Sequence, residues 1–383
     1  MKDKKIMKTA TITLHSAHNN GSFLQSFALQ RKIISMGYDN EIINYIPPAQ
    51  YSLYQNIIFK DSSFKGVIKG LLNLPRYSAL LERKNRFNEA QTFLKKTKKF
   101  EDISKFKKIV SPFDVLVAGS DQIWNIATMP DFTSLYLLPS EKYKISYAPS
   151  FGKSLKNQFD NPILIKSISE INQVSIREKS AQVELKSRLP YKDIEVVLDP
   201  TFLLDKTEYE ILVNKSNRKY KGDYIFFYCI KATNDVLKTV KLISKKLGLP
   251  VVTVFSGVST YKCQMFGQIV DFEAGPSEFV DYIKNAKYVI SNSFHGIVFS
   301  IIYEKIFYRI ADNEHGKIKV DERLDSILEL LGLTKQNIIA GSEFILNKDI
   351  DYLSSNKKLD KLKGKSTFWL ENSFKLAENM EKE

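Results

Sequence analysis

The sequence contains only two cysteines, Cys229 and Cys263, among 383 residues. Two cysteines cannot form the disulfide framework of a small secreted domain, and they do not form a Cys-x-x-Cys zinc-binding pair. Histidine is also scarce, with four residues. His15 and His18 lie three positions apart, but no third ligand has matching spacing, so we predict no metal site. This composition favours a reducing, cytoplasmic compartment.

Long apolar runs are also missing. No segment approaches the roughly 20 uncharged apolar residues that a membrane-spanning helix needs, and runs such as 297–303 have the length of a strand or a buried helix. The sequence has no short-period repeat and no recognised nucleic-acid-binding motif. We therefore expect a cytoplasmic globular protein that binds no nucleic acid, and any membrane contact would be peripheral, at the inner face of the plasma membrane.

Charge is plentiful but unevenly placed. The formal net charge is +14, and residues 51–110 carry 14 Lys and Arg against 5 Asp and Glu. Within this part, residues 51–108 interleave basic and aromatic residues in a helical pattern, which predicts an inserted helical segment. Such a segment could lie on an anionic membrane surface and bring the site to a lipid-linked acceptor. Alternatively, it forms an amphipathic helix that packs on its own domain with its lysines in water.

The remaining pattern alternates strands and helices. A strand at 9–14, a helix ending near Gly37 and a strand at 40–45 open a βαβ unit, which implies a parallel sheet. A further strand is expected at 173–176, and a second βα series begins near residue 224, with a helix at 234–247 and a strand at 288–291. The predicted fold is α/β, with two Rossmann-like domains facing across a cleft in a GT-B-like architecture. The predicted parts are a first domain at 1–204 on the acceptor side, a second domain at 205–350 on the donor side, and a helical tail at 351–383 that packs back on the first domain.

Polar and ionisable residues gather in four loops, each after a predicted strand: 15–22, 119–125, 175–180 and 291–296. Because ligands of such folds bind at the carboxyl ends of the strands, we expect these loops to line one cleft. Gly21 and Ser22 could open the following helix and direct backbone N–H groups toward an anion.

Taken together, six spaced segments resemble the polysaccharide pyruvyl transferase family. The resemblance implies transfer of an enolpyruvyl-derived group from phosphoenolpyruvate to hydroxyls of a sugar, usually as a cyclic ketal in surface polysaccharide biosynthesis. The acceptor is often a lipid-linked precursor, and no cofactor besides the donor substrate is implied. The segments are NNGSFLQSFALQ, DVLVAGSDQIWN, SYAPSFG, SIREKSA, VVLDPTFLL and SNSFHG.

Such a reaction needs an acid, a base and a cation. His295 is our candidate acid, because imidazole can hold and release a proton near neutral pH and the resemblance places this histidine in the donor site. The alternative is a helix cap or a buried structural histidine. Arg177 matches the family's donor-phosphate arginine, and its guanidinium suits phosphate or carboxylate. Its alternative role is a surface ion pair with Glu178. Asp121 is the candidate base, or else a helix cap.

The other candidate residues surround these three. On the donor side they are Lys179, Ser291, Ser293, Phe294 and Gly296, and on the acceptor side His18, Asn20, Gly21, Ser22, Ser120, Gln122 and Trp124. Trp124 could stack on a sugar ring, although a buried aromatic is the commoner role. We interpret Asp199 before Pro200 as a structural turn.

One position departs from the family pattern. Many members carry an arginine two residues before the histidine, where this sequence has Ser293. Either another cation such as Lys179 or Arg309 takes its place, or the donor binds differently. Two alternative functions stay open: a GT-B-type glycosyltransferase with a nucleotide-sugar donor, and a non-catalytic glycan-binding protein.

Overall fold

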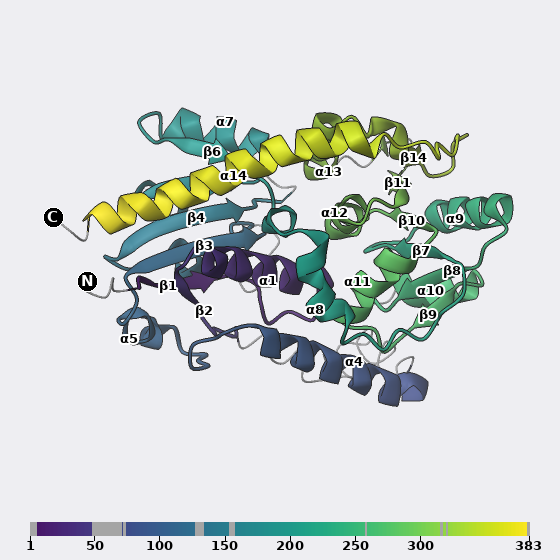
Figure 1. The fold of residues 1–383 in the computed structure, drawn as a ribbon, viewed down its shortest axis with the longest axis horizontal. Helices are drawn as coiled ribbons and strands as arrows, with labels where there is room; N and C mark the ends of the chain where they lie inside the picture. Colours follow the sequence, from purple (N-terminus) through teal and green to yellow (C-terminus); the bar gives the residue numbers. More distant parts are fainter. Residues whose placement is uncertain are drawn as a thin grey trace.

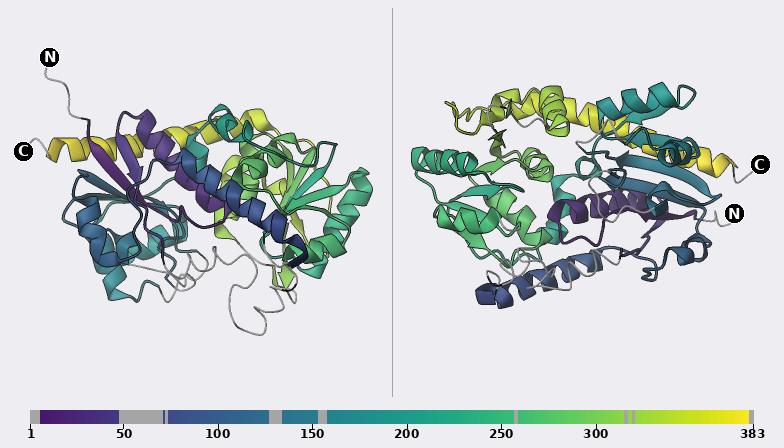
Figure 2. Two further views of the ribbon diagram at one scale, coloured as in Figure 1. Left: turned by 90° about the horizontal axis from the view of Figure 1, so that it is seen from below. Right: turned by 180° about the vertical axis from the view of Figure 1, so that it is seen from behind.

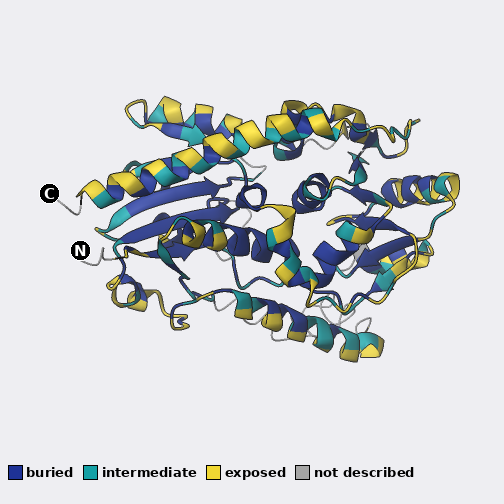
Figure 3. Cartoon of the chain, viewed as in Figure 1, coloured by how far each residue is buried: buried dark blue, intermediate teal, exposed yellow. Residues whose placement is uncertain are grey.

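The computed structural model describes residues 6–47, 71, 74–126, 134–152, 158–256, 259–314, 317–318 and 321–380. Within them the chain forms two six-stranded parallel sheets, each flanked by helices and lying side by side (Figure 1). The strands are almost wholly buried, as their runs of Val, Ile, Phe and Ala require of a parallel sheet covered on both faces (Figure 3). The predicted pair of Rossmann-like domains is therefore confirmed.

The first sheet has the order β2-β1-β3-β4-β5-β6. The strand order reverses direction between β1 and β3. These two strands pair in parallel, with Ala10 opposite Leu116. Ligands of open α/β sheets bind beside such a reversal, at the carboxyl ends of the strands. The bounds are β1 Lys8–Ile12, β2 Asp39–Ile42, β3 Val115–Asp121, β4 Tyr143–Pro149, β5 Gln173–Ile176 and β6 Ile194–Val196.

The second sheet has the order β14-β11-β10-β7-β8-β9, which is the strand order of a dinucleotide-binding Rossmann fold. Its reversal lies between β7 and β10, where Ser291 pairs with Tyr228. The bounds are β7 Ile225–Tyr228, β8 Val251–Val254, β9 Ile269–Asp271, β10 Tyr288–Ser291, β11 Ile306–Ala311 and β14 Asn337–Ile339. A short antiparallel ribbon, β12 Asn313–Glu314 with β13 Lys317–Ile318, follows β11.

Local sequence signals explain where the helices begin and end. In α9, the Thr233 side chain accepts a hydrogen bond from the Val236 N–H, and Gly248 ends the helix at φ +67°. The helices are α1 Asn20–Ser35, α4 Tyr77–Ala90, α5 Phe106–Val110, α6 Pro162–Ser169, α7 Lys179–Arg188, α8 Glu210–Val213, α9 Asn234–Leu247, α10 Ser259–Met265, α11 Pro276–Asn285, α12 Phe294–Ile302, α13 Glu322–Leu331 and α14 Tyr352–Met380.

Helix α14 runs along both domains. It begins beside α13 of the second domain and ends near the N-terminus, over the first sheet (Figures 1 and 2). Its last turns bury Leu370, Phe374 and Ala377 in the same cluster as Val115 of β3. The Phe374 ring stacks on Tyr38 with the ring centroids 4.4 Å apart. The helix therefore ties the chain's end to the first domain.

Helix α4 joins the domains on the opposite side, within the predicted basic insertion. Buried Arg86 contacts two carboxylates of the second domain, Glu273 at 3.1 Å and Glu278 at 3.4 Å. Arg76 lies over the rings of Tyr261 and Phe272. The described part of the 51–108 segment thus packs against both domains, rather than on its own domain alone.

The membrane interpretation of this segment depended on the basic residues Lys60, Lys65, Lys69 and Arg76. The three lysines lie outside the described residues, and Arg76 contacts aromatic rings of the second domain. Among the helices that the structure describes, none has both the length and the apolar character needed to cross a bilayer.

Candidate active site

Helix α1 follows β1, and helix α12 follows β10, each beside the point where the strand order of its sheet reverses. These two helices meet between the sheets. The contact is close. A Cβ atom added to Gly21 would lie 2.0 Å from Nδ1 of His295, so only glycine fits there. The first turn of α1 therefore forms one wall around the candidate acid.

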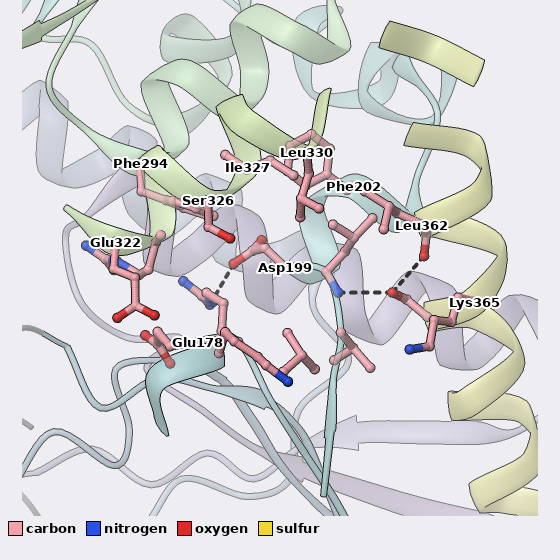
Figure 4. Close-up of a pocket in the computed structure, with 17 residues that line it drawn as sticks. Glu178, Asp199, Phe202, Phe294, Glu322, Ser326, Ile327, Leu330, Leu362 and Lys365 are labelled. Atoms are coloured by element: carbon pink, nitrogen blue, oxygen red, sulfur yellow. Dashed lines mark hydrogen bonds and ion pairs between the residues drawn. The ribbon is translucent and has the colours of Figure 1, made fainter. Parts of the chain in front are cut away.

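Asp199 lies between the two principal candidates. One carboxylate oxygen is 2.6 Å from Nη2 of Arg177, which comes from the first domain, and 3.8 Å from Nε2 of His295, which comes from the second. Figure 4 shows this carboxylate at the centre of the pocket. Asp199 also accepts a hydrogen bond from the Thr201 N–H at 2.9 Å, as a turn residue does. Its interpretation as a structural turn was therefore incomplete, because it also joins the guanidinium to the imidazole.

Arg177 is buried and does not form a surface ion pair with Glu178. Its Nη2 donates to the Ser120 hydroxyl, and its guanidinium lies 5.1 Å from the ring centroid of Phe294. Its Nε and Nη1 have no hydrogen-bond partner among the described residues, and neither do Glu178 Oε2 and His295 Nε2. Buried polar atoms are rarely left unpaired in folded proteins. Four of them in one place indicate a site for a polar ligand.

The charges in this cluster shift one another's pKa values. Burial lowers the pKa of His295, although the nearby carboxylates of Asp199 and Asp121 oppose this change. Burial disfavours the charged form of Asp199, but the Arg177 guanidinium and the hydrogen bonds from Thr201 outweigh it and hold the pKa of Asp199 below its usual value. Burial also raises the pKa of Glu178, against the effect of Arg177. The site thus favours a neutral imidazole beside an ionised Asp199.

Asp121 ends β3 in a left-handed backbone conformation, with φ +70°. Its carboxylate accepts hydrogen bonds from the Ser22 hydroxyl at 2.6 Å and from the Gln122 N–H at 2.8 Å. A non-glycine residue in this conformation is strained, and such strain is concentrated at functional sites. Asp121 therefore faces α1 and the imidazole, and caps no helix of its own among the described residues.

Three residues predicted to contact a ligand are instead packed inside the protein. Trp124 is fully buried and its indole N–H donates to the Tyr136 carbonyl, so it cannot stack on a sugar. Ser291 is also fully buried, and its hydroxyl donates to the Tyr228 carbonyl. A Cβ on Gly296 would lie 2.3 Å from Ser291 Oγ, so this glycine serves helix packing. These three residues shape the site without lining it.

The remaining candidates lie at different distances from the centre. Ser120 is buried and joins Arg177 to the Ala148 carbonyl. Ser293 precedes α12, and its N–H donates to Ser291. The His18 ring stacks on Phe87 of α4, with the ring centroids 5.0 Å apart. Asn20 makes a hydrogen bond across the domain interface with the Tyr228 hydroxyl. Lys179 makes a local one with Gln182.

Two cavities adjoin the cluster. The smaller, about 220 Å³, is lined by Arg177, Glu178, Lys179, Asp199, Phe294 and Arg323, with Leu362 and Lys365 of α14 closing one side (Figure 4). The larger, about 600 Å³, lies between the domains, and its polar lining comprises Gln122, Asn125, Lys231, Asn292, Arg309, Asp312, Asp321 and Arg323. Sequence reasoning gave no role to Asp312, Asp321 or Arg323, since no local motif marks them, and it considered Glu178 only as an ion-pair partner of Arg177.

Metal ligands do not gather here. No group of three or more His, Cys, Asp or Glu side chains in the part of the chain that the structure describes could hold a metal ion. His15 instead donates or accepts a hydrogen bond with Asn44 at 3.1 Å. Burial lowers the pKa of His15 to about 4.

The two Rossmann-like sheets, with polar clusters and a cavity between them, form a GT-B-like architecture. The sequence model of the polysaccharide pyruvyl transferase family matches residues 19–314. The chain belongs to this family and is a polysaccharide-modifying transferase, as the sequence segments predicted. No curated protein sequence matches the chain.

Solved structures resemble the fold at very low sequence identity. A UDP-GlcNAc 2-epimerase from Methanocaldococcus jannaschii is 11% identical, with 92% of each chain covered and a TM-score of 0.49. The heptosyltransferase WaaC of E. coli is 8% identical over 93% of this chain and 99% of its own, with a TM-score of 0.39. The glycosyltransferase SnogD from Streptomyces nogalater is 10% identical over 97% and 99%, with a TM-score of 0.41.

Proposed function

We propose that the protein transfers an enolpyruvyl-derived group from phosphoenolpyruvate to hydroxyls of a sugar. The observation that supports this most is the contact of Asp199 with both Arg177 and His295, beside guanidinium N–H groups that find no partner in the described part of the chain. A small dianion can bind those N–H groups within reach of the imidazole. Phosphoenolpyruvate carries both the anionic groups and the basic carbon that this arrangement suits.

Binding of the donor promotes protonation of the His295 imidazole. Burial keeps His295 neutral in the free site, but a phosphate or carboxylate placed beside the ring favours the imidazolium. The proton is therefore taken up as the anion binds. Arg177, held by Asp199, neutralises the donor charge with N–H groups on the side that Asp199 does not occupy.

The proposed reaction begins with protonation of the bound donor. His295 gives its proton to the methylene carbon of the donor, leaving an oxocarbenium-like centre at the neighbouring carbon. A sugar hydroxyl adds there and loses its proton to Asp121, which already accepts the Ser22 hydroxyl. The bond from that carbon to the phosphate oxygen breaks, inorganic phosphate leaves, and a second hydroxyl adds to close the ketal. The released protons return His295 to its acid form and go to phosphate or solvent.

The larger cavity is the proposed acceptor site. Its carboxamides, from Gln122, Asn125 and Asn292, and its carboxylate, from Asp312, are groups that bind sugar hydroxyls. Asp312 is 5% exposed, and none of the residues that the structure describes gives its Oδ2 a hydrogen bond. It can therefore accept a hydroxyl proton from a ligand in this cleft.

A nucleotide-sugar donor is the second candidate, favoured by one observation. The larger cavity lies at the winding reversal of the second sheet, where Rossmann-type domains bind nucleotides. Transfer from a nucleotide sugar would not require the Arg177–His295 pair to meet a small dianion.

The test is incubation with phosphoenolpyruvate and a panel of free and lipid-linked sugars, with released phosphate and product mass as readouts. Parallel incubations contain UDP-, GDP- and ADP-sugars in place of phosphoenolpyruvate. Acceptor-dependent phosphate release, lost in His295→Gln, is the expected result. Glycosyl transfer from a nucleotide sugar, with no phosphate released from phosphoenolpyruvate, would replace this proposal by the second.

A further inference from the structure

Arg323 lines both cavities, although it has no part in the steps above. It lies in the first turn of α13, where the preceding Asp321 holds it by two hydrogen bonds. Nε donates to Oδ1 at 3.1 Å and Nη2 donates to Oδ2 at 3.0 Å. A guanidinium that is hydrogen-bonded along one edge has a fixed orientation, and its Nη1 hydrogens take no part in these two bonds.

Arg323 and Arg177 face the same aromatic ring. Their guanidinium carbons lie 5.4 Å and 5.1 Å from the ring centroid of Phe294. Each arginine is also held by one aspartate, Asp321 for the first and Asp199 for the second. Both guanidinium groups are largely shielded from water, with side-chain exposures of 3% for Arg177 and 12% for Arg323. A dianionic ligand that contacts both would pair with two cations at once.

The residue between Asp321 and Arg323 joins the two domains. The carboxylate of Glu322 accepts hydrogen bonds from the N–H of Ser180 at 2.9 Å and from its hydroxyl at 2.5 Å. Ser180 belongs to the first turn of α7, which follows the Arg177 loop. Figure 4 shows Glu322 and Glu178 on the same side of the pocket. The 321–323 segment is therefore fixed against the loop that carries Arg177.

We propose that Arg323 is the second cation that binds the donor, and that Asp321 and Glu322 position it. The inference rests on the proposed function and adds a residue from α13 to the donor site. It also accounts for the serine at position 293. The two substitutes considered from the sequence are less well placed: Lys179 is bonded to Gln182, and Arg309 contacts Asp325 at 3.2 Å and lines only the larger cavity.

The test measures phosphoenolpyruvate binding by calorimetry, without an acceptor. Arg323→Ala should weaken binding at least about tenfold, since a charge-assisted hydrogen bond to the ligand is lost. Arg188→Ala removes a surface arginine of α7, paired with Glu184, and should stay within about twofold of the wild type. Arg323→Lys keeps the charge without the fork and should fall between the two. Unchanged binding in Arg323→Ala, or a larger loss in Arg309→Ala, overturns the proposal.

The failure of the proposed function gives a different result, since wild-type protein would then bind no phosphoenolpyruvate at all, and both proposals would fall. Positioning by Asp321 has its own readout. Asp321→Asn should raise the KM for phosphoenolpyruvate about tenfold and change kcat less, and should add little to Arg323→Ala in the double variant. A purely structural role would lower both variants' stability and give additive losses.

Discussion

Gly21 and His295 touch across the two domains, leaving no room for a methyl group on Gly21, since a Cβ there would lie 2.0 Å from the imidazole Nδ1. The first turn of α1 therefore fixes where the proposed acid can lie. The imidazole is buried between this turn and Asp199, so it cannot swing away without breaking its contact with that carboxylate.

Gly21→Ala should displace the imidazole and lower kcat at least about tenfold, because small misplacements of reacting groups are costly. The matched control is Gly364→Ala, in α14, where an added Cβ meets nothing within 4 Å. It should raise the free energy of unfolding by about 0.5–1 kcal/mol and leave kcat unchanged. Steady-state phosphate release and urea unfolding check both. Full activity in Gly21→Ala would show that the domains separate at this contact during turnover.

Asp199→Asn should lower both stability and the pKa of His295. It leaves the buried Arg177 guanidinium without its carboxylate, which should cost about 3 kcal/mol in the free energy of unfolding. The ionised Asp199 raises the pKa of His295, so its removal should move the alkaline limb of the kcat/KM profile to lower pH. Asp223→Asn, which alters an exposed pair with Lys287, should change neither. An unmoved alkaline limb would argue that His295 is not the titrating acid.

Acid should destabilise the protein partly through His15. Its pKa is about 4 in the folded protein and 6.5 in the unfolded chain, so protons bind the unfolded chain more readily. The stabilising contribution is complete above pH 6.5 and is lost as the pH falls toward 4, by about 3 kcal/mol. Urea unfolding from pH 8 to 4 should therefore show a smaller loss in His15→Gln than in the wild type. Parallel pH dependences would disprove this.

Arg86→Ala should loosen α4 from the second domain. The change leaves the carboxylates of Glu273 and Glu278 without their buried partner, and about 3 kcal/mol of unfolding free energy should be lost. Lys99→Ala removes an exposed pair with Glu101 and should cost less than about 0.5 kcal/mol. Equal effects in urea unfolding would mean that α4 contributes little to domain docking.

Most strands and helices could be predicted from the sequence because their patterns are local. The expected helix at 234–247 coincides with α9, whose cap and terminal glycine are both visible in the sequence. The expected strands at 173–176 and 288–291 coincide with β5 and β10. In contrast, β11 was not predicted, because only residues 303–305 separate it from α12 and two apolar stretches so close together are hard to assign to different elements.

The candidate site was only partly predictable. Arg177 and His295 stand in recognisable segments, and the structure does bring them to one carboxylate. That carboxylate belongs to Asp199. Because Pro200 follows it, the sequence indicates a turn there and gives no sign of the ion pair with Arg177. Arg323 has no local signal at all, because its contact with Phe294 depends on how α13 packs against α12. Long-range packing of this kind cannot be inferred from one sequence.

The central claim is that Arg177 and His295 contact the same donor molecule. NMR of the His295 imidazole tests it most directly. The protein has four histidines, so ¹⁵N-histidine labelling and a His295→Gln spectrum suffice to assign it. Saturating phosphoenolpyruvate should raise the pKa of His295 by at least about one unit, the effect of a nearby anion, and Arg177→Ala should abolish the response at the same concentration. An imidazole titration that phosphoenolpyruvate leaves unchanged in the wild type would contradict the account.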